Sequence, residues 1–199
     1  MSSLLSKKLD KEMYEDIINQ LKADKHLLTT TELRGIYPYA TIMNINKYIG
    51  YLNAYFSRYS ITAPLRQCAF LAQIGHESGQ LRYCEELASG QAYENRKDLG
   101  NTQRGDGVRF KGRGLIQITG RYNYEKFGKE MSIDLINHPE MLCYPEYATL
   151  SAFIFWSDRK LNDLADKEDM EGITRKINGG LRGLADRMEL YENAKKILL

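Results

Sequence analysis

The order of apolar and polar residues predicts helices along most of the chain. Apolar side chains recur every third or fourth position in several long stretches, and others are apolar almost throughout. We predict helices over residues 4–25, 41–59, 64–77, 121–130, 146–157, 168–177 and 184–197. A short helix should also follow residues 29–32, where a hydroxyl and a carboxylate offer capping groups, and end before Pro38.

The segment 64–77 is apolar on nearly all sides and should be a buried helix. Pro64 suits its first turn, and Gln73 is the only polar residue in its central run. Burying an ionised carboxylate is costly, so Glu77 at its end is expected where the helix reaches the surface or a cleft. In a cleft its pKa would be raised, as a general acid requires. Glu86, nine residues later, offers a second carboxylate.

The helical pattern stops between residues 87 and 110, which are rich in glycine, asparagine, aspartate and arginine. We expect a long surface loop, or a loop with short strands. Loops of more than about 15 residues inside a compact domain are uncommon and often functional. Residues 114–119 then alternate, which predicts a short strand or extended segment with Gln117 and Thr119 on one polar edge. Glycines here would let another backbone or a ligand approach closely.

These patterns predict one mainly α-helical domain with a loop-rich or weakly β middle. A chain of 199 residues is long enough for one substantial core. We expect residues 29–199 to form this domain and residues 1–28 to form an amphipathic helical extension packed on it. A recognition or delivery segment is the alternative interpretation of the extension.

Composition narrows the functional classes. The chain is 43% hydrophobic and 27% charged, as in ordinary globular proteins, and its net charge of +2 gives no case for a nucleic-acid partner. No stretch approaches 18 apolar residues, so we expect no membrane insertion. The three histidines lack metal-ligand spacing, and we predict neither a metal nor another cofactor.

The cysteines bear on the compartment. Cys68, Cys84 and Cys143 are odd in number, widely spaced and form no C-x-x-C pair, so we expect thiols in a reducing compartment. No apolar segment follows the lysines near the start, which predicts no signal peptide of the usual form. We therefore expect synthesis in the cytoplasm and delivery to any outside target through a pore or a secretion apparatus.

Two carboxylates in a helical domain with a loop-rich middle suggest glycoside hydrolysis. That reaction needs one carboxylic acid to protonate the leaving oxygen and one carboxylate on the other face. The nine-residue spacing of Glu77 and Glu86 is by itself weak support, because the chain has 26 acidic residues and most such pairs are surface charge. The context, a buried helix before the pair and a long loop after it, favours catalysis.

Four motifs strengthen this interpretation. They are H-E-S-G at 76–79 with Tyr83 and Glu86, F-K-G-R-G-L-I-Q-I-T at 110–119 followed by Y-N-Y at 122–124, I-N-G-G at 177–180, and A-D-R at 185–187. In this order they resemble the signatures of glycoside hydrolase family 19, which comprises chitinases and related phage and bacterial peptidoglycan hydrolases. The short spacing between the two glutamates, the R-G-D-G run at 104–107 and the unpaired cysteines resemble the endolysin-type branch.

The resemblance implies a lysozyme-like helical catalytic domain over residues 29–199 with a central substrate cleft. It makes Glu77 the general acid and Glu86 the base that activates water, with inversion at the anomeric carbon. Arg187 matches an arginine that orients the carboxylates, and an arginine beside Glu86 would keep it ionised. The expected substrate-binding residues are His76, Tyr93, Arg113, Gln117, Thr119, Tyr122, Asn123, Asn178 and Arg187.

Several alternatives stay open at this point. Glu85 or Asp106 could replace Glu86 as the second carboxylate, although Asp106 is more simply a turn residue. His76 could be structural, and Trp156 is expected in the core rather than on a sugar. Peptidoglycan is the expected substrate, with chitin as the alternative. A lytic transglycosylase is the alternative reaction, and a non-catalytic wall-binding module is the alternative class of protein. We expect a monomer, with an immunity protein or delivery machinery as possible binding partners.

Overall fold

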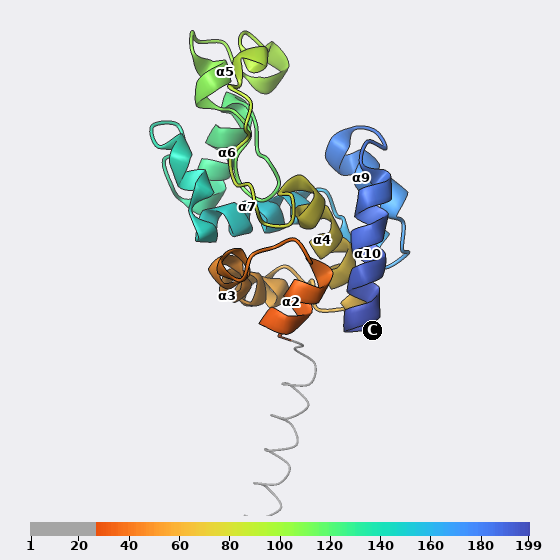
Figure 1. The fold of residues 1–199 in the computed structure, drawn as a ribbon. Helices are drawn as coiled ribbons and strands as arrows, with labels where there is room; N and C mark the ends of the chain where they lie inside the picture. Colours follow the sequence, from red (N-terminus) through yellow and green to blue (C-terminus); the bar gives the residue numbers. More distant parts are fainter. Residues whose placement is uncertain (1–26) are drawn as a thin grey trace, which may run out of the picture.

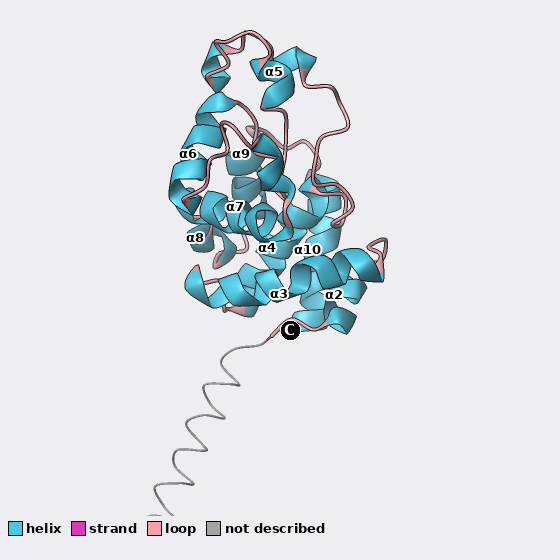
Figure 2. Ribbon diagram, turned by 90° about the vertical axis from the view of Figure 1, so that its left-hand side faces the viewer, coloured by secondary structure: helices cyan, strands magenta, loops and turns pink. Residues whose placement is uncertain are grey.

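The computed structural model describes residues 27–199, and helices make up most of this part (Figures 1 and 2). The predicted helices within it are confirmed, with boundaries that move by one or two residues. The extension predicted over 1–28 lies outside the described residues except for Leu27 and Leu28. The α-helices are α2 (Thr30–Ile36), α3 (Ile42–Arg58), α4 (Pro64–Glu77), α5 (Asp106–Arg109), α6 (Arg121–Met131), α7 (Pro145–Asp158), α8 (Asn162–Ala165), α9 (Met170–Asn178) and α10 (Leu184–Leu198).

Helix α4 is the central element, as its apolar sequence predicts. Pro64 stands in its first turn, and every residue from Gln67 to Gly75 is buried. Helix α10 packs along it, and α3 and α7 lie on the other side (Figure 1). The ring of Phe70 lies 4.3 Å from that of Phe153 and 5.3 Å from that of Trp156, both on α7. Trp156 is therefore a core residue, as expected.

The chain between α4 and α7 forms a separate upper lobe, residues 85–142, which carries α5 and α6 at the top of Figure 1. The stretch from 87 to 110 contains three short helices in place of the short strands considered above. They are the 3₁₀ helices η1 (Gln91–Tyr93) and η2 (Lys97–Leu99), and α5; a third 3₁₀ helix, η3 (Pro139–Cys143), ends the lobe.

A buried carboxylate organises this loop. Asp106 accepts hydrogen bonds from the backbone N–H groups of Thr102 (3.1 Å) and Gln103 (2.9 Å), and it pairs with Arg121 of α6 at 2.6 Å. Only 2% of the Asp106 side chain is exposed. The loop is ordered because charged side chains bind its backbone, a cause that apolar periodicity does not reveal.

The strand predicted over 114–119 is wrong. Gly114 and Gln117 have positive φ angles of 82° and 55°, so the chain turns back on itself. Arg113 and Ile118 pair through two backbone hydrogen bonds of 3.1 and 2.7 Å, which form an isolated bridge. The turn packs on α7, where the N–H of Leu115 donates to the carbonyl of Ala148. Apolar residues on both alternating sides are buried as a result.

Two helical glycines form a matched test of this packing. A Cβ at Gly75 of α4 would lie 2.6 Å from the ring of buried Tyr37, whereas a Cβ at exposed Gly50 of α3 would meet nothing within 4 Å. Alanine favours a helix over glycine by about 1 kcal/mol. We expect Gly50→Ala to raise the free energy of unfolding by about 0.5–1 kcal/mol, and Gly75→Ala to lower it by roughly 1–2 kcal/mol through the clash. Urea unfolding measures both, and a stabilised Gly75→Ala protein would contradict the close α2–α4 contact.

Asp106→Asn tests the anchoring of the upper lobe. Arg121 holds the pKa of Asp106 below its usual value, so this pair stabilises the fold at neutral pH. The contribution is present above the pKa of the unfolded chain and is lost as the pH falls through the lowered pKa of the folded state. We expect the variant to be about 2 kcal/mol less stable at pH 7, with a difference that shrinks in acid. Urea unfolding between neutral and acid pH measures the difference. An equal loss of unfolding free energy at every pH would contradict the role of the charge.

Candidate active site

An arginine from α10 holds the carboxylate at the end of α4. Arg187 is 1% exposed, and its two terminal nitrogens donate to Glu77 Oε1 and to Gln73 Oε1, one turn earlier on α4. A planar guanidinium that binds two side chains fixes the orientation of both. Among the described residues none donates to the other Glu77 oxygen, Oε2. The expectation of an arginine beside Glu86 is therefore wrong for Arg187, which lies against Glu77.

A second pair lies beside the first. His76 Nδ1 lies 2.5 Å from Asp186 Oδ2, so in the neutral ring Nδ1 carries the hydrogen and Nε2 remains an acceptor. The imidazole rests on Gly183, the N-cap of α10, where a Cβ would lie 2.4 Å from the ring. Gly183 also has a positive φ of 76°. Glycine therefore suits this position for two reasons, the lack of room for a Cβ and the left-handed backbone.

These residues open onto a hollow of about 290 Å³ at the junction of α4, α9 and α10. Four of its five lining residues are ones that the sequence assigned to the site: His76, Glu77, Asn178 and Arg187; the fifth is Arg182. Asn178 ends α9, and its side-chain amide donates to the carbonyl of Arg182 at 3.1 Å. That bond shapes the turn between α9 and α10.

The second carboxylate belongs to the upper lobe. Glu86 accepts a hydrogen bond from the hydroxyl of Tyr93 (3.0 Å) and another from the N–H of Gly112 (3.1 Å). Its own N–H donates to the carbonyl of Gly112 at 2.9 Å. Tyr93 is half-buried, and burial together with its bond to Glu86 raises the pKa of the phenol. Glu86 is thus fixed through both its backbone and its side chain.

Gly112 is the point where the polar groups of the lobe converge. A Cβ there would lie 2.8 Å from Gln117 Oε1, 3.2 Å from Glu86 Oε2 and 3.4 Å from Thr119 Oγ1. The turn described above, with its positive φ at Gln117, brings Gln117 and Thr119 to this place. The proximity that the sequence predicted for these two side chains is present, although it arises from a turn and not from a strand edge.

A second hollow, of about 220 Å³, adjoins this cluster. Gln117, Thr119 and Asn123 line it together with Ile177 of α9. Asn123 donates to the carbonyl of Thr119 at 2.8 Å, which ties α6 to the turn. Since Ile177 lines this hollow and the next residue, Asn178, lines the first, the end of α9 lies between the two.

The rival carboxylates have other contacts. Glu85 is exposed and binds Lys111 (2.5 Å) and Arg113 (2.8 Å). Burial raises its pKa, but the hydrogen bonds from both cations outweigh that effect and the net shift is downward. Asp106 is the anchor of α5 described above. The structure therefore brings Glu86, and neither Glu85 nor Asp106, beside Gln117 and Thr119.

Two predicted binding residues lie elsewhere. The guanidinium of Arg113 is taken up by Glu85, by the carbonyl of Arg109 and by the hydroxyl of Tyr124, and it lines neither hollow. Tyr122 is exposed on α6 and also lines neither. Arg113 has a structural reason to be where it is, because it bridges the turn to Glu85 next to Glu86.

Three residues at the site were not assigned to it from the sequence. Gln73 was noted only as the single polar residue of an apolar run, yet its place one turn before Glu77 is the signal that it meets the same partner. Asp186 belongs to the A-D-R motif and binds His76. Arg182 had no signal beyond its position after I-N-G-G.

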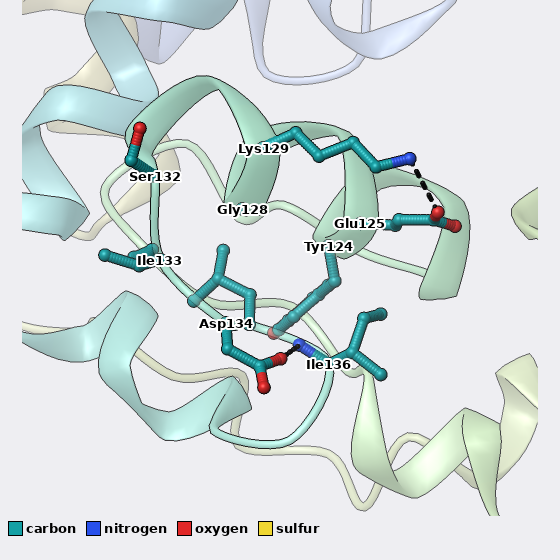
Figure 3. Close-up of a pocket in the computed structure, with 9 residues that line it drawn as sticks. Tyr124, Glu125, Gly128, Lys129, Ser132, Ile133, Asp134 and Ile136 are labelled. Atoms are coloured by element: carbon teal, nitrogen blue, oxygen red, sulfur yellow. Dashed lines mark hydrogen bonds and ion pairs between the residues drawn. The ribbon is translucent and has the colours of Figure 1, made fainter.

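Another hollow lies away from both carboxylates. It sits between α6 and the loop after it and is lined mainly by apolar and backbone surface around Gly128, Ile133 and Ile136, with Lys129 paired to Glu125 at its rim (Figure 3). Within residues 27–199 no three His, Cys, Asp or Glu side chains are grouped to hold a metal ion, and no helix is long and apolar enough to cross a membrane.

Comparison with known proteins decides the family. The family model for glycoside hydrolase family 19, described as chitinase class I, matches residues 9–170. The chain belongs to glycoside hydrolase family 19. It is accordingly a glycosidase. A family 19 domain-containing protein of Haemophilus influenzae is 34% identical over 158 residues, which cover 64% of this chain and 77% of that protein.

Plant members of family 19 share a smaller part of their length. An endochitinase of Arabidopsis thaliana is 37% identical over 127 residues, 63% of this chain but 43% of the plant protein. Among solved structures, chitinase C from Streptomyces griseus HUT6037 has a TM-score of 0.68 at 20% identity and covers 86% of this chain and 92% of its own. A class IV chitinase from Zea mays has a TM-score of 0.67 at 21% identity, with 86% and 92% covered. These likenesses establish the family 19 fold with its lysozyme-like helical domain.

The clamp on Glu77 is testable with two arginines, Arg187 of α10 and Arg66 in the first turn of α4. Arg187→Lys keeps the charge but cannot reach Gln73 and Glu77 together, so we expect kcat on a glycan substrate to fall about 100-fold through misplacement of the carboxylate. Arg66→Lys is the control, because Arg66 also binds a carboxylate, that of Asp166, through two nitrogens and lines neither hollow. We expect its activity to stay within about threefold of the parent. Unchanged kcat in folded Arg187→Lys protein would contradict the clamp.

Proposed function

We propose that this family 19 enzyme hydrolyses the β-1,4 bonds of the peptidoglycan glycan strand with inversion. The observation that carries the proposal is the presence of two fixed carboxylates on opposite parts of the fold. Glu77 is held by Arg187 at the end of α4, and Glu86 is held by Gly112 and Tyr93 in the upper lobe. Inverting glycosidases require this division of roles, with room for a water between the carboxylates.

In this mechanism Glu77 is the general acid. It would donate a proton through Oε2 to the glycosidic oxygen as the bond to the anomeric carbon breaks. Arg187 occupies Oε1 and so presents the other oxygen to the substrate. Asn178 lines the same hollow and would contact the sugar on this side.

Glu86 is the base in the same step. It would take a proton from a water molecule as that water attacks the anomeric carbon from the opposite face. The hydroxyl of Thr119 and the side-chain oxygen of Gln117 converge with Glu86 Oε2 near Gly112, and are suited to hold this water and an adjacent sugar. Asn123 continues the polar lining on the sugar side.

Charge favours peptidoglycan over chitin as the substrate. Chitin is uncharged, whereas the stem peptides of peptidoglycan carry carboxylates. The hollow beside Glu77 includes the exposed Arg182, for whose side chain no partner exists among the described residues. The second hollow includes Arg159, which lies over the ring of Phe155, and Lys126, which is already paired with Asp158. Unpaired cations at a substrate site attract anionic ligands.

Chitin is the second candidate substrate. Family membership and the similarity to an Arabidopsis endochitinase support it, although this chain covers less than half of that protein. Both candidates use the same bond type and the same carboxylates. They differ only in what surrounds the scissile sugar.

Adjacent glutamates give a matched test of the base. We expect Glu86→Gln to reduce the hydrolysis of purified sacculi by about 10²–10⁴-fold, because water loses its proton acceptor. Glu85→Gln should retain activity within about threefold, because that side chain binds Lys111 and Arg113 outside both hollows. Release of new reducing ends measures both variants. Loss in Glu85→Gln alone would move the base to Glu85, and equal loss in the two would contradict the assignment of the base to Glu86 alone.

Arg182→Gln separates the two substrates. We expect it to raise KM on sacculi about tenfold, from the loss of one charge-assisted contact, and to leave cleavage of chitin oligomers unchanged. Reducing-end assays on both substrates give the comparison. Faster turnover of chitin oligomers than of sacculi by the parent enzyme would favour the chitinase assignment, and binding to sacculi without any cleavage would indicate a wall-binding module.

A further inference from the structure

Two cysteines that are far apart in the sequence meet at the base of the upper lobe. The thiol of Cys143 lies 3.2 Å from the carbonyl oxygen of Cys84, and the thiol of Cys84 lies 3.6 Å from the carbonyl oxygen of Cys143. Neither thiol is bonded to another cysteine. Each sulfur therefore faces the residue that carries the other.

The two cysteines stand at the two ends of the upper lobe in the sequence. Cys84 comes immediately before the upper lobe, two residues ahead of Glu86, and its carbonyl accepts the N–H of Gly114 at 2.8 Å. Cys143 ends η3, just before α7 begins. The chain between them is the whole upper lobe, so the two cysteines stand where the chain enters the lobe and where it leaves it. A covalent bond here would close the lobe at its base.

The surroundings distinguish these two thiols from the third. A hydrogen bond from the Cys143 thiol lowers the pKa of Cys84, and the hydroxyl of Tyr48 adds to the effect. The same contact raises the pKa of Cys143, so Cys84 is the thiol that ionises first. Both side chains are half-buried, whereas Cys68 is fully buried in α4 and burial raises its pKa to about 11. Thiolate character and access determine which cysteine reacts.

We propose that Cys84 and Cys143 form an intramolecular disulfide when the protein meets an oxidising environment, and that this bond clamps the lobe that carries Glu86. The proposal is independent of the substrate and of the catalytic roles given above. It requires an oxidant of the disulfide class, such as oxidised glutathione or a disulfide-exchange protein, as found outside reducing compartments.

The reaction proceeds by two exchanges. The Cys84 thiolate attacks one sulfur of oxidised glutathione, forms a mixed disulfide and expels one glutathione thiolate. Cys143 then loses its proton and attacks the Cys84 sulfur, which expels the second glutathione. Two protein thiols are oxidised, one glutathione disulfide is reduced to two thiols, and the two protons from the cysteines pass to the two leaving thiolates.

The test uses the full chain, reduced and then incubated with oxidised glutathione. We expect the thiols titrated after denaturation to fall from three to one, the intact mass to lose two hydrogen atoms without added glutathione, and peptide mapping to join Cys84 to Cys143. Cys68→Ser is the matched control and should oxidise like the parent. Cys84→Ser and Cys143→Ser should form no internal bond.

Stability supplies the second readout. Closing a loop of this length restricts the unfolded chain, so we expect Tm of the oxidised parent to exceed that of the reduced parent by roughly 10 °C. Reductant should abolish the difference, and neither Cys84→Ser nor Cys143→Ser should show it. Persistent glutathione adducts or dimers linked through cysteine would overturn the pairing. An internal bond that leaves Tm unchanged would overturn the clamp.

Discussion

The ion pair between Arg187 and Glu77 is the interaction on which the site depends. A guanidinium that is almost fully buried is costly unless it is well paired, and here it has Glu77 and Gln73 as partners on successive turns of one helix. This pairing is possible only because α10 packs along α4. The same contact sets the start of α10, where Asp186 meets His76 and Gly183 makes room for the imidazole. Core packing and active-site geometry are therefore one constraint on this side of the molecule.

The upper lobe meets a different constraint. The stretch from 87 to 110 has few apolar residues to bury, and it is ordered instead by carboxylates that bind backbone N–H groups and arginines, as Asp106 does. Gly112 has no room for a larger side chain, because Glu86, Gln117 and Thr119 all approach the position that its Cβ would occupy. The Cys84–Cys143 contact lies at the root of the same lobe. The helical body thus presents one carboxylate, and the lobe that packs on α7 presents the other.

Apolar periodicity predicted the helices well, because helices such as α4 and α7 bury continuous apolar surfaces and begin at prolines. It failed at residues 114–119, where alternation suggested a strand but positive φ at Gly114 and at Gln117, a non-glycine residue, makes a turn. No sequence pattern signals left-handed backbone at a glutamine. The motifs located most of the residues at the two hollows, yet they also included Arg113, whose contacts with Glu85 and Tyr124 are internal. Motif membership does not separate residues that touch a ligand from those that support them. Gln73 is the reverse case, because it binds Arg187 at the site although it belongs to none of the motifs.

The anomeric configuration of the product is the most direct test of the two-carboxylate account. Proton NMR during the first minutes of cleavage of a defined β-1,4-linked glycan oligomer reports the configuration of each new reducing end before mutarotation. Glu77 acting as acid and Glu86 directing water from the opposite face predict the α-anomer, since inversion follows from attack on that face. A product that first appears as the β-anomer, or an anhydro-sugar end without a free anomeric hydroxyl, would contradict the account.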